Sequence, residues 1–279
     1  MEIQQSKPYA DFITSLGWRV ITRSRQYYYL KRLPLVGALL KVQRVTKLPD
    51  LTSFLALLKT ERVTRLAVEP DARIPMEELN AWIRKIPGHI AVSHDPFLPT
   101  KTNRIDVRHD EQSLFHALSE AKRRAVRRAL KNHIRVIVGK DIRSLIRVKN
   151  ASAGFLGCIT TYGLDKLWAQ FPPDHKDTLL AYTARDTVVA GILLLYWQNT
   201  AYYWVAGATR EGKHLFAPTL LVWEAIKCAK KRGATQLDFV GVWDERMPNQ
   251  NHQWKGFTKF KEGFGGKDMY YPFVTAQNI

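Results

Sequence analysis

The sequence predicts a two-domain α/β protein (α+β in character) built on mixed sheets. Its 279 residues exceed the ~100–200 typical of one domain, and 46% of them are hydrophobic, which is enough to form folded cores. Runs of β-branched and aromatic residues alternate with amphipathic helical segments along the chain. We place the division at residue 150, with a first domain over residues 1–150 and a second over residues 151–279.

The first domain is expected to contain short helices between strands. A helix over residues 8–16 ends at Gly17, which fits a left-handed cap. Asp50 is placed to cap a second helix that runs to about residue 59, and Pro75 to open a third. The expected strands lie at residues 18–33, 33–45 and 64–68, with two more near Ile90 and Ile105.

The most distinct helix is predicted over residues 110–132, where Asp110 is a suitable N-cap. One face repeats apolar and small residues at helical spacing: Leu114, Leu118, Ala121, Ala125 and Ala129. The other faces carry six cations within ten residues: Lys122, Arg123, Arg124, Arg127, Arg128 and Lys131. A strand over residues 134–139 then ends the first domain.

The second domain is expected to contain three consecutive strands over residues 179–208, with turns at Arg185-Asp186 and at residues 198–200. Pro218 lies near the start of a helix that Gly233 ends, and a strand over residues 235–242 follows. Antiparallel strands followed by a helix and another strand are typical of an acyltransferase-like α/β unit.

The chain is strongly basic, with 43 Lys and Arg against 25 Asp and Glu and a formal net charge of +18. Such an imbalance attracts polyanions, so nucleic acid, an anionic membrane or a phosphorylated substrate is the expected partner. Cations four residues apart in the basic helix repel one another, and bound phosphates would relieve that repulsion. A charged surface helix without a ligand is the simpler alternative.

A second basic region, WKGFTKFKEGFGGKDMYYPF over residues 254–273, interleaves lysines with aromatic residues and four glycines. If TKFK is a strand, Lys259 and Lys261 point to one face and Phe260 to the other. A lysine held there could bind a phosphate or stabilise negative charge that develops at a carbonyl. The glycines would let backbone amides approach a ligand. A terminal hairpin with ordinary surface lysines is the alternative.

The remaining candidate residues are acidic or histidine side chains. Asp238 lies on an apolar strand, so it must either have a partner or open into a cleft, where it would contact substrate. Asp244, Glu245 and His252 could take part in acid–base chemistry. The sequence lacks GxxxxGK[ST], HExxH, GxSxG and paired-cysteine patterns, and we predict no metal and no nucleotide cofactor.

Three features favour a cytoplasmic protein. The first residues carry no secretory signal, and the longest apolar run, residues 188–197, is far shorter than the ~20 residues that span a bilayer. Cys158 and Cys228 lack CxxC spacing and are expected to be reduced and buried.

Four blocks of sequence carry a family resemblance. They are PFLPTKTNRIDVRHDEQSLFHALSEAKRRAVRRALKNHIRV (residues 96–136), AYTARDTVVAGILLL (181–195), AYYWVAGATREGKHLFAPTLLVWEAI (201–226) and LLVWEAIKCAKKRGATQLDFVGV followed by WKGFTKFKEGFGG (220–266). With these blocks the chain resembles the FemABX family of peptidoglycan-bridge aminoacyltransferases.

The resemblance implies two GNAT-related acyltransferase domains, and no long heptad insertion is present to form a coiled-coil arm. It implies transfer of an amino acid from aminoacyl-tRNA to the stem peptide of a peptidoglycan precursor, either UDP-MurNAc-peptide or lipid II, during cell-wall biogenesis. No CoA is used, and peripheral contact with the inner membrane face is compatible with such an acceptor.

The resemblance also assigns residues. Phe260 and Lys261 match the family's Phe-Lys pair at the reaction centre, where Lys261 would stabilise charge as the ester carbonyl is attacked. Tyr203 and Trp204 fall near the strand positions at which the family binds its precursor. The basic helix and Lys259 would then hold the tRNA.

The sequence departs from the family at the start of the second domain. Residues 150–168, NASAGFLGCITTYGLDKLW, offer no arginine where the family usually holds the phosphates of the precursor. Two other functions stay open: an N-acyltransferase that uses an acyl thioester of CoA, and a non-catalytic nucleic-acid-binding protein.

Overall fold

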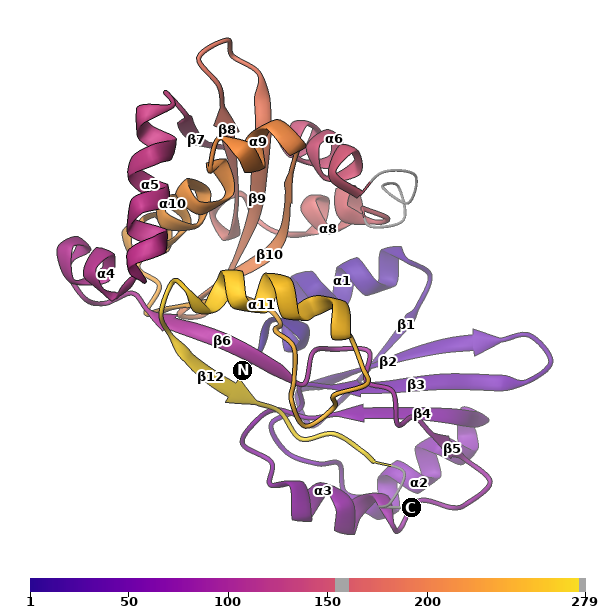
Figure 1. Ribbon diagram of the computed structural model, residues 1–279. Helices are drawn as coiled ribbons and strands as arrows, with labels where there is room; N and C mark the ends of the chain where they lie inside the picture. The colour runs from indigo at the N-terminus through magenta and orange to yellow at the C-terminus, as the bar shows by residue number, and fades with distance from the viewer. Residues whose placement is uncertain (154–160, 276–279) are drawn as a thin grey trace. The chain divides into compact units, whose positions relative to one another are not determined.

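The computed structural model describes residues 1–153 and 161–275, and the chain forms two compact units (Figure 1). Unit 1 comprises Met1–Lys101 and the segment that starts at Met269, and unit 2 comprises Thr102–Asp268. These bounds differ from a division at residue 150, because the strand that follows the basic helix, β7 (Arg135–Gly139), pairs with β8 (Lys176–Tyr182) in unit 2.

Unit 1 is built on a five-stranded sheet in the order β1-β2-β3-β4-β5. β1 (Arg19–Arg23), β2 (Gln26–Leu33) and β3 (Gly37–Gln43) are antiparallel, whereas β4 (Val63–Glu69) runs parallel to β3 and to β5 (Ala91–Val92). Its helical elements are η1 (Ile3–Gln5), α1 (Lys7–Ser15), α2 (Leu51–Thr60) and α3 (Met76–Ile83).

The core of unit 1 joins α2 and α3 to the middle strands of the sheet. Phe54 of α2 packs on Trp82 of α3, with ring centroids 5.0 Å apart, and both belong to one buried cluster with Leu40 of β3 and Leu66 of β4. As predicted, the Asp50 carboxylate accepts the backbone N–H of Ser53 and caps α2.

Unit 2 is built on a seven-stranded sheet in the order β12-β6-β11-β10-β9-β8-β7. Besides β7 and β8, its strands are β6 (Lys101–Asp106), β9 (Val188–Trp197), β10 (Thr200–Ala208), β11 (Gln236–Asp238) and β12 (Lys267–Tyr270). Its described helical elements are α4 (Glu111–Ala117), α5 (Glu120–Lys131), α6 (Ile142–Ala153), α8 (Leu164–Gln170), η3 (Pro173–His175), α9 (Arg210–His214), α10 (Ala217–Lys231), η4 (His252–Trp254) and α11 (Lys255–Glu262).

Strand β9 is covered on both faces, which explains its uninterrupted apolar run. Ile192 packs in one buried cluster with Leu221 of α10. Toward the opposite face, a Cβ added at Gly191 would lie 2.8 Å from Leu145 Cδ1 of α6. None of the helices in the described part of the chain is long and apolar enough to cross a membrane.

The helix predicted over residues 110–132 is two helices. Asp110 caps α4 as predicted, but Leu118 is extended (φ −64°, ψ 143°) and Ser119 begins α5, where its hydroxyl accepts the backbone N–H of Lys122. The break shifts the helical phase, so Val126 is buried together with Ala129, whereas Ala121, expected on the buried face, is exposed.

Two predicted strands differ in the structure, one divided into a hairpin and the other shortened. Residues 18–33 form a hairpin, because Ser24 and Arg25 turn the chain with positive φ angles of 48° and 61°. The strand over residues 235–242 is reduced to β11, because Val240 and Gly241 leave the extended conformation with φ of 63° and 154°.

The TKFK segment is helical instead of extended, since it lies within α11. Residues two apart on a helix point ~200° away from each other. Lys259 is accordingly exposed while Lys261 is half-buried, so the expectation that the two lysines share a face is wrong.

Candidate active site

Lys261 lies inside unit 2 where the backbone leaves β11. Its ammonium donates hydrogen bonds to the carbonyl oxygens of Phe239 at 2.9 Å and Gly241 at 2.6 Å. Both carbonyls flank Val240, whose positive φ turns the chain away from the sheet at this point. The described hydrogen bonds use two of the three N–H groups of the ammonium.

The environment of Lys261 is largely aromatic. Its Nζ lies 4.8 Å from the ring centroid of Phe257 and 5.8 Å from those of Tyr203 and Phe239. Burial lowers the pKa of Lys261 to about 8, and the carboxylate of Asp238 opposes that shift. The same lack of water raises the pKa of Tyr203, so this phenol stays protonated near neutral pH.

A pocket of about 470 Å³ is lined by Tyr203 and Phe257, whose rings also lie near the Lys261 ammonium, although Lys261 is not itself among the lining residues. Phe260 completes its aromatic wall. The other lining residues come from β9, β10 and the α9–α10 region: Gly191, Ile192, Ala206, Gly207, Ala208, Lys213, Phe216, Pro218, Thr219 and Leu221. The pocket is thus mainly apolar, with Lys213 as a cation on its wall.

Asp238 has partners inside the protein, which is the first of the two alternatives predicted for it. Its carboxylate accepts hydrogen bonds from the Thr102 hydroxyl, the Arg104 guanidinium and the backbone N–H of Val240, each at 2.6 Å. Asp238 is only 2% exposed. It therefore ties β6 to β11 and fixes the turn whose carbonyls bind Lys261.

The basic helix α5 contacts the closing segment directly. The Lys122 amine lies 3.7 Å from the ring centroid of Phe260 and 5.0 Å from that of Phe264, and the Ser119 N–H donates to the Gly263 carbonyl at 2.9 Å. Burial lowers the pKa of Lys122 to about 8. Lys122 is therefore packed on the aromatic wall and does not belong to the exposed cationic face.

Gly263 and Gly266 of the closing segment allow close packing against α5 and β6. A Cβ at Gly263 would lie 2.6 Å from Lys122 Cε, and one at Gly266 would lie 2.4 Å from Asn103 Oδ1. Gly265 and Gly266 also have positive φ, of 83° and 98°. Glycine is needed at positions 263 and 266 because a side chain would collide with neighbouring atoms of the protein itself.

The other cations of α5 divide into two groups. Arg123 donates to the carbonyls of His116 and Leu118 and so caps the C-terminus of α4. Exposed positions are held by Arg124, which pairs with Glu120 at 2.6 Å, and by Arg127, Arg128 and Lys131.

The remaining predicted residues lie outside the pocket wall. Trp204 is the extra residue of a bulge in β10, between Tyr203 and Val205, and is absent from the described pocket lining. Asp244 is buried and paired with Arg246 at 2.6 Å, whereas Glu245 and His252 are exposed.

Residues 1–153 and 161–275 contain no cluster of three or more His, Cys, Asp or Glu side chains that could hold a metal ion. Cys228 is a half-buried free thiol whose pKa burial raises, and Cys158 lies outside the described residues. The same gap covers part of residues 150–168, the segment in which the family usually has its arginine.

The pocket residues that sequence reasoning missed include Lys213, Phe216 and Phe257. The signal for the first two was the segment REGKHLFAP. Gly212 approaches β9 so closely that a Cβ there would lie 2.4 Å from the Val189 carbonyl oxygen, and this approach brings Lys213 to the sheet. Phe257 could have been found only if α11 had been recognised as a helix.

The fold of the chain is similar to the folds of several solved structures. It is similar over 97% of its length to the crystal structure of FemX, with a TM-score of 0.72, 14% identity and 90% of that chain covered. It is also similar to L-PGS from Bacillus licheniformis (TM-score 0.56, 12% identity, 93% and 83% covered) and to a tandem GNAT protein from the clavulanic acid biosynthesis pathway (0.50, 13%, 90% and 80%). The predicted GNAT-related α/β fold is confirmed.

The closer relationship comes from the family model. Residues 175–270, from η3 to β12, match the FemAB family, and this range contains Tyr203, Asp238 and Lys261. The resemblance drawn from the sequence is therefore confirmed over this range, which covers about a third of the chain. No curated protein matches it in sequence.

Proposed function

We propose that the protein is an aminoacyltransferase that takes its aminoacyl group from aminoacyl-tRNA and adds it to the stem peptide of a peptidoglycan precursor. The observation that carries the proposal is the position of Lys261. This residue of the FemAB-matching segment lies near the rings of Tyr203 and Phe257, which line an aromatic pocket, and Phe260 of the same pocket is packed on Lys122 of the basic helix α5. Unit 2 therefore contains all three parts of the proposed site: the Lys261 cation, the apolar pocket and the arginine-rich helix α5.

The chemistry requires orientation more than activation. The neutral amine of the acceptor attacks the ester carbonyl carbon, a C–N bond forms, the C–O bond to the terminal ribose breaks, and the amine proton ends on the released ribose hydroxyl. Holding the two reactants together supplies much of the rate because the ester is already activated. Lys261 would donate its remaining N–H to the oxyanion that develops on the carbonyl oxygen.

This role predicts a specific pH dependence. Transfer should fall as the pH rises through about 8, because burial lowers the pKa of Lys261 to about 8 and only its ammonium form stabilises an oxyanion. Unfolding cannot explain that loss: the folded pKa is below the 10.5 of the free side chain, so this group raises stability as the pH rises between those values.

Single-turnover rates across the neutral and alkaline range would measure this profile. Lys261→Arg stays charged throughout that range, so it should retain partial activity without the alkaline fall. An identical alkaline limb in the Arg variant would assign the pH dependence to another group.

The exposed arginines of α5 predict salt-dependent tRNA binding. Arg127→Gln/Arg128→Gln should weaken binding and flatten the plot of log K against log salt by roughly 0.7–0.9 for each phosphate that the variant no longer neutralises. Filter-binding titrations at several salt concentrations would measure the slope. Arg185→Gln, an exposed arginine in the β8–β9 turn, is the matched control and should leave the slope unchanged.

The direct test of the function is transfer of label from a radiolabelled pool of charged tRNA to a nucleotide-linked precursor, with an RNase-treated control. Label should appear in the precursor and RNase should abolish it. The two alternative functions have separate signatures in the same protein preparation. CoA-dependent thermal stabilisation with acyl transfer from a thioester would indicate a CoA enzyme, and tight RNA binding without any transfer would indicate a binding protein.

A further inference from the structure

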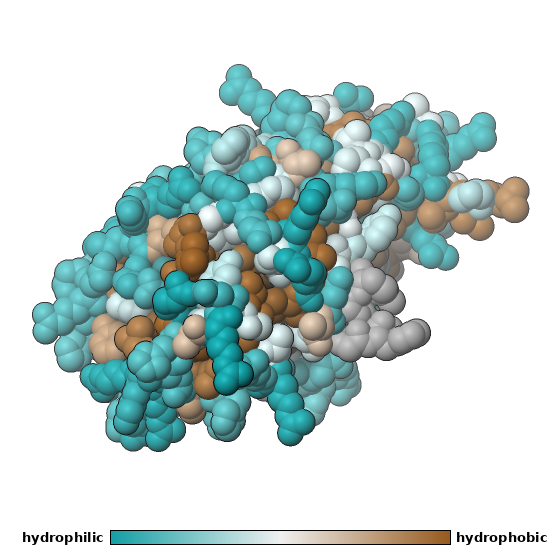
Figure 2. All heavy atoms as spheres, turned by 90° about the horizontal axis from the view of Figure 1, so that it is seen from above, coloured by the Kyte–Doolittle hydropathy of each residue, from teal (hydrophilic) through white to brown (hydrophobic). Residues whose placement is uncertain are grey.

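The turn between β2 and β3 of unit 1 is apolar where hairpin turns are usually polar. Its sequence is Leu33-Pro34-Leu35-Val36, and the last two side chains are 106% and 55% exposed. Turns of this kind ordinarily carry Gly, Asn, Asp or Ser. Figure 2 shows a hydrophobic group that projects at the right, the side on which Figure 1 draws this turn.

Leu35 also has an unfavourable backbone conformation. Its φ is 65°, in the left-handed region that residues with a branched, bulky side chain rarely adopt. Folding gains nothing from the side chain in return, because the side chain is fully exposed. Strain combined with an exposed aliphatic side chain indicates that something other than the fold of unit 1 benefits from Leu35.

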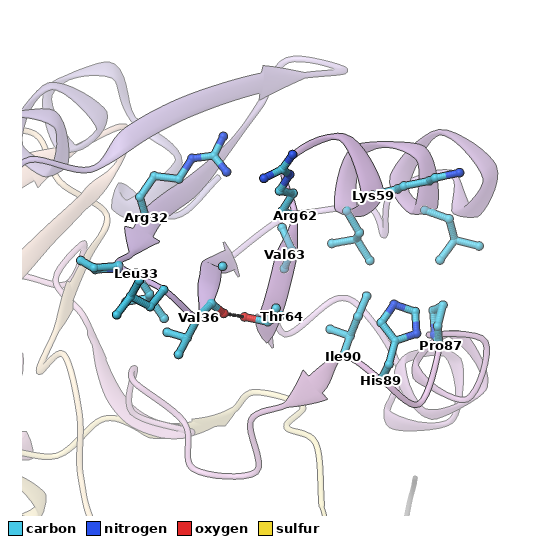
Figure 3. Close-up of a pocket in the computed structure, with 15 residues that line it drawn as sticks. Arg32, Leu33, Val36, Lys59, Arg62, Val63, Thr64, Pro87, His89 and Ile90 are labelled. Carbon is cyan, nitrogen blue, oxygen red and sulfur yellow. Dashed lines mark hydrogen bonds between the residues drawn. The ribbon is translucent and has the colours of Figure 1, made fainter.

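A pocket of about 1100 Å³ opens beside the turn (Figure 3). Leu33 and Val36 from the turn, Leu58 from α2, Val63 from β4 and Ile90 give it an apolar lining. The Thr64 hydroxyl donates to the Val36 carbonyl at 2.5 Å and fixes the turn at the edge of the pocket.

The charged residues of this pocket are cationic. Arg32, Lys59 and Arg62 line it, and the described lining includes no Asp or Glu. Figure 3 shows Arg32, Arg62 and Lys59 along one side of the pocket and Pro87, His89 and Ile90 along the other. Arg32 donates to Glu61 at 2.8 Å, and Glu61 is not among the lining residues. The charged side chains that line the pocket are therefore positive.

We propose that this turn and pocket form a membrane-docking surface, in which Leu35 and Val36 insert into an anionic phospholipid bilayer while Lys59 and Arg62 contact lipid phosphates. Aliphatic side chains that project beside positive charge match the apolar and anionic layers of such a bilayer. RNA phosphates could contact the cations, but RNA would offer no apolar layer for the exposed Leu35 side chain. The inference does not depend on the transfer reaction, so either can fail without the other.

The test is co-sedimentation of the full chain with vesicles of phosphatidylcholine, with and without phosphatidylglycerol. Binding is expected with the anionic vesicles. Leu35→Asn should weaken it roughly ten-fold, since an amide replaces the aliphatic group that enters the bilayer, and Lys59→Gln/Arg62→Gln should weaken it by about five-fold for each charge removed.

The design separates docking from general charge attraction and from misfolding. Asn tolerates a positive φ, so Leu35→Asn should match or exceed the parent in thermal stability. Ile137→Thr, which removes a 47% exposed aliphatic side chain from β7, is the matched control and should bind vesicles as the parent does.

Three results would overturn the proposal. One is equal vesicle binding by the parent and Leu35→Asn, which would assign the binding to net charge alone. A second is RNA binding that Leu35→Asn weakens while vesicle binding is unaffected. The third is a change of oligomeric state in Leu35→Asn, measured by sedimentation, with no change in vesicle binding, because the turn would then contact a second copy of the chain.

Discussion

Replacement of Lys261 by Met should reduce transfer from charged tRNA by about 100-fold to 1000-fold, the range typical of losing one donor to a developing oxyanion. Met retains the length of the side chain and can occupy the aromatic surroundings formed by Tyr203, Phe239 and Phe257. The two carbonyls that accept from Lys261 lose their donor, which costs some stability but leaves the core of unit 2 in place. Single-turnover transfer and circular dichroism would measure the two effects.

The control is Lys267→Met, which removes an exposed lysine of the same closing segment and should transfer at the parental rate. Lys259→Met should instead raise the tRNA concentration needed for half-maximal transfer and leave the maximal rate unchanged, since we assign Lys259 to tRNA binding. Parental transfer by Lys261→Met would remove this lysine from the mechanism.

Truncation of Asp238 to Ala should lower the free energy of unfolding by about 3 kcal/mol or more, because it leaves a buried guanidinium without its carboxylate. The side chain of Arg104 is only 11% exposed and donates to Asp238 at 2.6 Å. The same truncation removes the acceptor of the Thr102 hydroxyl and of the Val240 N–H. Urea unfolding followed by fluorescence would measure the decrease.

Asp238→Asn separates this structural role from a direct contact with substrate. Asn keeps two of the three described partners and should lose less stability than Ala, with transfer reduced only as far as the turn that binds Lys261 is disturbed. If Asp238→Asn instead kept parental stability and raised only the half-saturating concentration of the precursor, Asp238 would be a substrate-binding residue.

The sequence predicted those elements whose signals are local. The caps at Asp50 and Asp110, the helix that begins near Pro218 and the three strands of residues 179–208 agree with α2, α4, α10 and β8–β10. Each depends on a capping side chain, a turn sequence or a clear periodicity within a few residues. The same signals were sufficient for the two-unit α/β fold.

The errors arose where tertiary contacts decide the backbone. The helix over residues 110–132 breaks because the Ser119 N–H donates to Gly263, which is distant in sequence. The division at residue 150 failed to anticipate that β7 pairs with β8. Lys122 looked like a member of a solvated cationic face because its neighbours Phe260 and Phe264 come from the other end of unit 2.

The candidate site was predicted in part. Lys261 was identified by its motif, but the pocket near it also contains Lys213 and Phe216, which follow the close approach of Gly212 to β9. Close approach of two backbones leaves little trace in a single sequence beyond a glycine. The partners of Asp238 were equally hidden, since Thr102 and Arg104 precede it by more than a hundred residues.

In the proposed reaction, the ester end of a charged tRNA binds beside Lys261. The most direct test of this binding is reductive methylation of lysines near pH 8, read by mass spectrometry, with and without an aminoacyl-adenosine analogue in which an amide replaces the ester. Saturating analogue should slow methylation of Lys261 and leave that of the exposed Lys267 unchanged. Equal methylation of Lys261 with and without the analogue would contradict the proposed binding.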